Sequence, residues 1–400
     1  MASTMVCLWL LFMIITQVVG EDTQSMIMSL MVDSTNCQVA CLTQSQCKAA
    51  TFYRSTSNCE LFDNIFNQNG NMLADTDATS MSIISGTRFP PVCTWSQTAI
   101  TIFGSQAGTS GSNLTLLSQP IGMYYDGPNN MLVVADFGNQ RILRFSITNP
   151  PTVATVIAGS HGVGCNISQF NSPDGVGIDS SGQLYVADFF CNQVVRFPSN
   201  SNSTTSGTLL GSVMVAALIS INQLTNDIYV VSHADNAVYK FVGGNGSPVV
   251  AAGGNGNGNA SNQLSGPSGV CYDYLYTNAL YVTDQGNYRV MKYPSGSTSG
   301  TYGTVVAGGN GVGSGANQLN EPRNIVVDSN GALYIADGNN NRIQRWLQNA
   351  SSGTTIVGGT QGAAANQLDF PETVLFDKYN NLLISDRRNN RIQLFNLTTC

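Results

Sequence analysis

Six segments of the chain align with one another without gaps, and this internal repeat constrains the fold more than any other feature of the sequence. The segments span residues 132–145, 184–197, 228–241, 280–293, 333–346 and 382–395. Their fifth residues, which lie 52, 44, 52, 53 and 49 positions apart, are Asp136, Asp188, Ser232, Asp284, Asp337 and Asp386. A repeat of this length suits one four-stranded blade of a β-propeller.

Each unit has the same order of expected strands and turns. In the fifth unit, an inner strand is expected over residues 322–328, followed by strands over 333–336, 342–346 and 355–359. Short strands at regular spacing, with no helical periodicity between them, favour a radial propeller over a sandwich. Only 10% of the residues are charged and 41 are glycine, which is typical of strands and polar turns. We predict a mainly β fold with a six-bladed propeller over residues 94–400.

The ends of the repeat region indicate how the ring closes. An outer-strand run at residues 99–104 precedes the first unit, whereas the sixth unit ends near Phe395 without one. We expect the early run to complete the last blade, because this removes the open edges of a linear array. Phe395 precedes Cys400 by five residues and Cys93 precedes Thr101 by eight. A Cys93–Cys400 disulfide would therefore replace the missing loop between the third and fourth strands.

A second disulfide is predicted within the propeller. Cys165 lies in the loop that leads into blade two, and Cys191 lies in the turn between its second and third strands. In an up-and-down blade these two segments share one face. Nine of the ten cysteines follow residue 20, so one thiol is left over. Cys271, on an expected inner strand, is the candidate for this thiol and would act as a small buried hydrophobe.

The pattern P-x-x-x-x-x-D…G-x-L-Y-V-A-D…N-R-I resembles the NHL repeat family, and the resemblance covers about residues 94–400. Blade three departs from the pattern at Ser232 and Ala237, and blade two at Gln193. In four blades an Asp is followed by Asn three residues on and by Arg five residues on; the Asp and Arg residues are Asp136, Arg141, Asp284, Arg289, Asp337, Arg342, Asp386 and Arg391.

These groups suit a turn. The carboxylate can accept backbone N–H groups, the Asn can adopt a left-handed conformation, and the Arg can pair with the carboxylate. An active site is usually needed once, so repetition in four blades favours a structural role over shared metal binding.

The N-terminal region lies outside the repeat. Residues 1–20 have an apolar core and end in small residues, which predicts a secretory signal peptide, with an uncleaved anchor as the alternative. Residues 21–93 contain Cys37, Cys41, Cys47 and Cys59, which indicates a small extracellular module stapled by two disulfides. Four cysteines alone permit three connectivities.

The stretch CQVACLTQSQCKAATFYRSTSNCELF resembles a PAN/apple module, an α+β domain. The resemblance implies that Cys37 and Cys41 lie on a helix and that the disulfides are Cys37–Cys59 and Cys41–Cys47.

Charge and targeting limit the partners. With 16 basic and 23 acidic residues the net charge is −7, which disfavours nucleic acid. No later segment has eighteen consecutive apolar residues, so we expect a secreted, extracellular protein with no membrane insertion after signal removal. Seven Asn-x-Ser/Thr sites are compatible with secretion as a glycoprotein: Asn113, Asn166, Asn202, Asn245, Asn259, Asn349 and Asn396.

Catalytic signals are sparse. The chain has two histidines, His161 and His233, and no H-E-x-x-H or G-x-S-x-G motif, so a three-histidine zinc site cannot be built. Asp174 and Glu372, each just after an inner-strand proline, could meet at the mouth of the channel and bind a cation such as Ca²⁺. The alternative is ordinary surface charge. No other cofactor is expected.

We therefore expect a secreted, non-catalytic recognition or adhesion protein that binds an extracellular protein or glycan through propeller loops and the PAN/apple-like module. The alternative is a metal-dependent hydrolase or lyase with its site in the central channel. The partner is expected on the face formed by the inter-blade loops and the turns between second and third strands. Residues that vary in these turns are the candidates: Phe190, Arg387 and Arg388, then Phe137, Phe189 and His233. Phe137 and Phe189 could instead fill gaps between blades.

Overall fold

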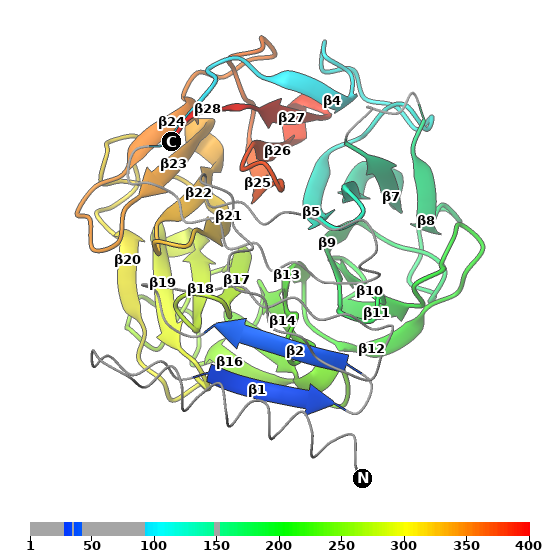
Figure 1. The fold of residues 1–400 in the computed structure, drawn as a ribbon, viewed down its shortest axis with the longest axis horizontal. Helices are drawn as coiled ribbons and strands as arrows, with labels where there is room; N and C mark the ends of the chain where they lie inside the picture. Colours follow the sequence, from blue (N-terminus) through cyan, green and yellow to red (C-terminus); the bar gives the residue numbers. More distant parts are fainter. Residues whose placement is uncertain (1–27, 34–35, 42–92, 148–152) are drawn as a thin grey trace, which may run out of the picture. The chain divides into compact units, whose positions relative to one another are not determined.

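The computed structural model describes residues 28–33, 36–41, 93–147 and 153–400, the first two ranges as backbone only. The chain divides into two compact units, Met1–Thr87 and Arg88–Cys400. The second unit is a six-bladed β-propeller, with the blades arranged around a central axis (Figure 1). This confirms the mainly β fold that the repeat predicts.

Every blade is a four-stranded antiparallel sheet whose first strand lies nearest the axis. The strands of blades one to three are β5 (Pro120–Asp126), β6 (Met131–Asp136), β7 (Arg141–Ser146), β8 (Thr155–Gly159), β9 (Pro173–Ile178), β10 (Leu184–Asp188), β11 (Gln193–Phe197), β12 (Thr208–Ser212), β13 (Ala216–Asn222), β14 (Asp227–Ser232), β15 (Ala237–Phe241) and β16 (Val249–Gly253). Those of blades four to six are β17 (Gly269–Asp273), β18 (Ala279–Asp284), β19 (Arg289–Pro294), β20 (Thr304–Gly308), β21 (Pro322–Val327), β22 (Leu333–Asp337), β23 (Arg342–Trp346), β24 (Thr354–Gly358), β25 (Pro371–Phe376), β26 (Leu382–Asp386), β27 (Arg391–Phe395) and β4 (Ile100–Gly104).

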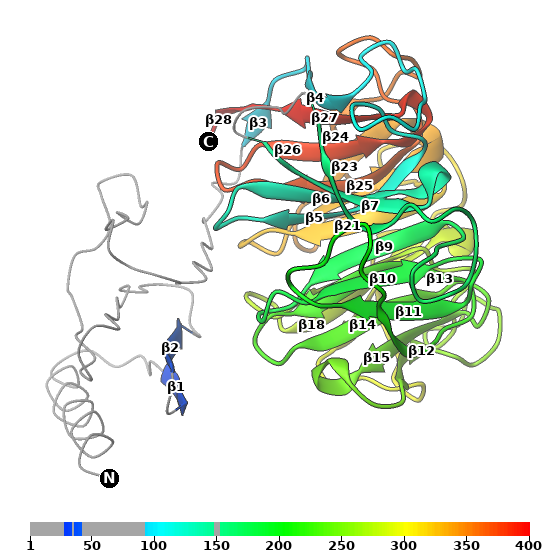
Figure 2. The same cartoon turned by 90° about the vertical axis from the view of Figure 1, so that its right-hand side faces the viewer.

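The last blade is built from both ends of the propeller sequence. Its outer strand is β4, which pairs with β27 in the register Gln393 with Thr101. Beside it, β3 (Thr94–Trp95) pairs with β28 (Leu397–Thr399), and the two short strands lie next to each other in Figure 2. A disulfide joins Cys93 to Cys400, with the two Cα atoms 4.2 Å apart. The ring closes as the positions of the strands and cysteines in the sequence predict.

The apolar core of the propeller is divided among the interfaces between neighbouring blades. Between blades one and two, for example, Val133 and Ala135 pack with Val176 and Val186. An equivalent cluster lies at each of the other five interfaces of the described ring. The cluster between blades five and six also contains Trp95, so the segment before β4 packs into the interface between these two blades. Each blade is therefore stabilised mainly by its two neighbours.

In the N-terminal unit, β1 (Met28–Asp33) and β2 (Asn36–Cys41) form an antiparallel pair. Cys37 and Cys41 thus lie in a strand, whereas the family resemblance implies a helix. The predicted Cys37–Cys59 and Cys41–Cys47 disulfides and the signal segment 1–20 fall outside the residues whose side chains are described.

Helical structure in the described residues is limited to five 3₁₀ turns: η1 (Phe137–Asn139), η2 (Val242–Gly244), η3 (Gln285–Asn287), η4 (Gly338–Asn340) and η5 (Arg387–Asn389). No helix in this part of the chain has the length and apolar character needed to cross a membrane.

Candidate functional site

The repeated Asp, Asn and Arg residues form a buried network that fixes one face of each blade. In blade one, Asp136 Oδ1 accepts a hydrogen bond from the Ser118 backbone N–H, and Asp136 Oδ2 accepts bonds from Asn139 and from Arg141 Nε at 2.7 Å. Arg141 also donates to the Ser112 and Asn113 carbonyls of the preceding inter-blade loop. Asp–Arg pairs at 2.7–2.8 Å recur in blades four, five and six. The turn and the inter-blade loop are thereby tied together.

One detail of the turn differs from the sequence expectation. The left-handed residue is the one after the repeated Asn: Gln140, Tyr288, Asn341 and Asn390 have φ values of 51–54°. The repeated Asn instead uses its side-chain amide to bond the loop, as Asn139 does with the Gly111 carbonyl at 2.9 Å.

Blade two replaces this network with a covalent link. Gln193 occupies the Arg position, so the buried Asp188 has no guanidinium partner and burial raises its pKa to about 7. Cys191 occupies the Asn position and forms the predicted disulfide with Cys165, with Cα atoms 5.3 Å apart. Cys191 Sγ also lies 3.4 Å from the Gly164 carbonyl oxygen, which corresponds to the atom bonded by Asn in other blades.

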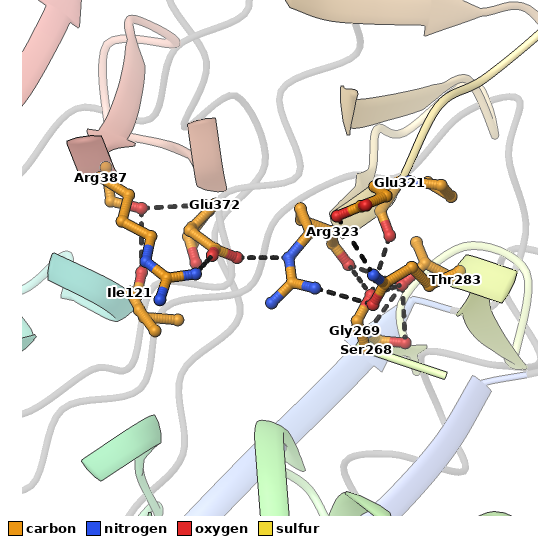
Figure 3. Close-up of polar contacts among 12 residues, drawn as sticks. Ile121, Ser268, Gly269, Thr283, Glu321, Arg323, Glu372 and Arg387 are labelled. Atoms are coloured by element: carbon orange, nitrogen blue, oxygen red, sulfur yellow. Dashed lines mark hydrogen bonds and ion pairs between the residues drawn. The ribbon is translucent and has the colours of Figure 1, made fainter. Parts of the chain in front are cut away.

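Four charged side chains gather where the inner strands begin. Asp174, Arg323 and Glu372 each follow the first proline of β9, β21 and β25, and Arg387 comes from η5. Glu372 is completely buried and accepts hydrogen bonds at 2.6 Å from Arg323 Nε and from Arg387 (Figure 3). Arg323 also donates to Gln285 Oε1 at 2.7 Å.

Hydroxyl groups connect neighbouring blades next to this cluster. Thr283 Oγ1 donates to the Arg323 carbonyl at 2.6 Å and accepts from the Gly269 N–H (Figure 3). Ser268 Oγ donates to the Pro322 carbonyl at 2.8 Å. These bonds hold the inner strands of blades four and five close together and fix the position of Arg323.

The two proposed cation ligands, Asp174 and Glu372, interact electrostatically, but two arginine side chains already pair with Glu372. The charge of Glu372 acts on Asp174, which is 2% exposed; burial first, and Glu372 second, raise the pKa of Asp174 to about 7. Asp174 Oδ1 has no hydrogen-bond partner in the structure. Both oxygens of Glu372 already accept bonds from guanidinium groups, which would repel a metal ion. Among the residues with described side chains, no group of three His, Cys, Asp or Glu is placed to hold a metal.

The inter-blade loops and the second-to-third-strand turns do share one face, which we call the upper face. Phe190 is 58% exposed there, whereas Phe189 packs partly against the core between blades three and four and meets the Phe190 ring edge-on at 5.1 Å. His233 is half-buried, with Nδ1 3.1 Å from the Pro267 carbonyl oxygen, and burial lowers its pKa. A cavity of about 380 Å³ lies beside His233 and Gln285.

Arginine and aromatic side chains gather at the junction of blades one and six. The Phe370 ring lies 4.3 Å from the guanidinium carbon of Arg388 and 5.8 Å from that of Arg387. Arg387 also lies 5.3 Å from the centre of the half-buried Phe137 ring. A cavity of about 340 Å³ is lined here by Ser110, Ser118, Gln119, Arg387, Arg388 and Asn390.

Sequence analysis missed Arg323, Phe370 and Gln119. Arg323 stands at the same position after an inner-strand proline as Asp174 and Glu372, so its place in the repeat marks it as their neighbour. Phe370 and Gln119 each precede such a proline and have φ values of 57° and 50°. Nothing in the sequence marks them as neighbours of the arginines.

Two other sets of predicted residues can be placed. Cys271 on β17 is a free thiol, and burial raises its pKa to about 12. The asparagines of the seven Asn-x-Ser/Thr sites are all exposed, so the fold leaves each one accessible.

Two protein families match parts of the chain. Residues 7–85 match the PAN domain, and residues 117–145 and 319–346 match the NHL repeat. The NHL matches coincide with the first three strands of blades one and five. The PAN match begins inside the segment for which a signal peptide is predicted. No curated protein sequence matches the chain.

Several solved structures share the propeller fold at low sequence identity. A protein of unknown function from Bacteroides thetaiotaomicron is 16% identical, with a TM-score of 0.57 over 75% of this chain and 76% of that chain. An auxiliary nutrient binding protein from Bacteroides ovatus is 12% identical, with a TM-score of 0.55 over 77% and 78%. A gluconolactonase from Xanthomonas campestris is 12% identical, with a TM-score of 0.53 over 78% and 99%. These similarities show the fold alone.

Proposed function

We propose that this chain, which carries NHL repeats in a six-bladed β-propeller together with a PAN domain, is a secreted recognition protein that binds an extracellular protein or glycan on the upper face. The observation that carries the proposal is the composition of that face. Exposed Phe190 and Arg388 stand on turns fixed by buried networks and by a disulfide. Exposed aromatic and arginine side chains on a rigid scaffold are favoured interface anchors.

The solved structures with a similar fold do not decide between binding and catalysis, because they include both a nutrient binding protein and a gluconolactonase. The local chemistry favours binding. Glu372 is held between two guanidinium groups and is therefore unsuited to act as a general base. The disulfides of the propeller suit an oxidising, extracellular compartment.

The test uses the purified full chain on arrays of extracellular proteins and glycans. For the ligand found, Phe190→Ala should weaken binding at least tenfold. Tyr379→Ala is the matched control, because Tyr379 is a 62% exposed aromatic in the turn between β25 and β26, away from the upper face. Equal losses in both variants, or a loss only in the control, would place the binding surface elsewhere.

Metal analysis of the same preparation addresses the alternative of a metal-dependent hydrolase or lyase. A recognition protein of the kind proposed needs no metal in its channel. Stoichiometric Ca²⁺ or Zn²⁺ that is lost in a Glu372→Gln variant would instead support the enzyme.

A further inference from the structure

We infer that the cavity between blades one and six, which we call the arginine cavity, binds the carboxylate of an acidic sugar residue. This inference rests on the proposed function and names its ligand class. The cavity is lined by Ser110, Ser118, Gln119, Arg387, Arg388 and Asn390. Two of these side chains are cationic and none is anionic, although the chain as a whole has a net charge of −7. A local reversal of charge selects an anionic ligand.

The guanidinium of Arg388 is available to a ligand. Its side chain is 53% exposed, and its nearest carboxylate oxygen is Asp369 Oδ1 at 3.7 Å, beyond hydrogen-bond distance. The guanidinium carbon lies over the Phe370 ring, 4.3 Å from its centre, a cation–π contact that uses none of the N–H donors. A planar group held in this way can give two parallel hydrogen bonds to a carboxylate.

Arg387 is already largely engaged and acts differently. It donates to the buried Glu372 at 2.6 Å and to Gln119 Oε1 at 3.1 Å, and its side chain is 23% exposed. These bonds fix one wall of the arginine cavity. Arg387 shares the Glu372 carboxylate with Arg323.

The other lining groups favour a sugar over an acidic peptide. They are hydroxyl and amide groups, which match the hydroxyls of a sugar ring, and no aliphatic side chain lines the cavity to receive a peptide anchor. The volume of about 340 Å³ is at the small end of the range of roughly 300–1,000 Å³ for ligand pockets, which suits one sugar residue of a longer chain.

The experiment is a calorimetric titration of the full chain with three probes: a tetrasaccharide containing glucuronic acid, the same tetrasaccharide with its carboxyl groups reduced to alcohols, and a glutamate-rich peptide. We expect the acidic tetrasaccharide to bind at least tenfold more tightly than either of the others. Arg388→Gln should remove most of this preference, and Arg388→Lys should restore part of it. Lys378→Gln, which removes the same charge from an exposed position between β25 and β26, should bind like the wild type.

Equal binding of the acidic and neutral tetrasaccharides would overturn the inference, as would tighter binding of the peptide or an Arg388→Gln variant that behaves like Lys378→Gln. Failure of the wild type to bind the acidic tetrasaccharide at millimolar concentration would also overturn it. The proposed function is tested separately by the array ligands and Phe190→Ala, so the two can fail independently.

Discussion

At the scale of single residues, the repeated Asp–Arg pair shows how a buried charge is made tolerable. In blade five, Asp337 and Arg342 pair at 2.8 Å, and neither is appreciably exposed. Blade three replaces the pair by Ser232 and Ala237, and Ser232 Oγ donates instead to the Met214 carbonyl. Neither solution leaves a carboxylate without a partner at this position, whereas in blade two the buried Asp188 accepts hydrogen bonds from the Asn171 N–H and its pKa is raised.

A mutation series in blade five tests this condition. Arg342→Ala leaves a buried carboxylate without its partner and should destabilise the chain by about 3–5 kcal/mol. The double variant Asp337→Ser/Arg342→Ala reproduces the blade-three solution and should recover part of the loss. Thermal unfolding of both variants measures the effect; a double variant less stable than Arg342→Ala would show that the carboxylate itself is needed.

Asp174 gives a second prediction at this scale, on pH dependence. Its pKa is raised to about 7 in the folded chain from an ordinary value of 3.8. Between these values the folded state keeps a proton that the unfolded state releases, so this stabilising contribution is complete below about pH 4 and is lost as the pH rises through about 7. Asp174→Asn should remove this part of the slope. Melting temperatures from pH 4 to 8 measure it, and parallel profiles for variant and wild type would contradict the assignment.

At the scale of the blade, a link between the turn that follows the second strand and the inter-blade loop recurs, although the groups that form it differ between blades. Most blades use hydrogen bonds from Asn and Arg, and blade two uses the Cys165–Cys191 disulfide. The link positions the upper face, because it connects the two kinds of segment that form it. Phe190, next to Cys191, is held out into solvent by this arrangement.

We predict that the blade-two link can be exchanged for the hydrogen bond of the other blades. Cys165→Ser/Cys191→Ala should lose about 3 kcal/mol, the chain-entropy value for a disulfide that closes a loop of this size. Cys165→Ser/Cys191→Asn should lose less, because the amide can bond the Gly164 carbonyl. Denaturation midpoints compare the two; identical values would mean that the Asn bond contributes nothing in this blade.

At the scale of the whole molecule, stability depends on closing the ring. β4, which completes blade six, comes from a part of the chain almost 300 residues before its partner β27. The Cys93–Cys400 disulfide spans 307 residues, and Trp95 adds a ring contact with Tyr334 at 5.6 Å and a hydrogen bond to the Asn380 carbonyl at 2.8 Å. The ring is thus closed both by a covalent bond and by side-chain packing.

Removal of the closing disulfide should therefore have a local as well as a global effect. Cys93→Ser/Cys400→Ser should destabilise the chain by about 5 kcal/mol in the chain-entropy model, and hydrogen exchange should rise first in β4 and β27. The blade-two variant Cys165→Ser/Cys191→Ala is the control and should leave exchange in β4 unchanged. Uniform exchange changes across all blades would argue that closure is not a separate step.

The sequence by itself determined the propeller, the number of blades, the completion of blade six by residues 99–104, and the two propeller disulfides. These features follow from the periodicity of the strands, from turn contacts between residues five apart and from the number of strands needed to close the ring. Each of these signals lies within a short stretch of sequence and recurs from blade to blade. Only the tertiary structure decided that Glu372 is shared by Arg323 and Arg387, that the Arg388 guanidinium lies over the Phe370 ring, and that the arginine cavity exists. Each of those residues occurs once, and they meet because the ring brings separate blades together. No repeated sequence pattern could therefore predict their contacts.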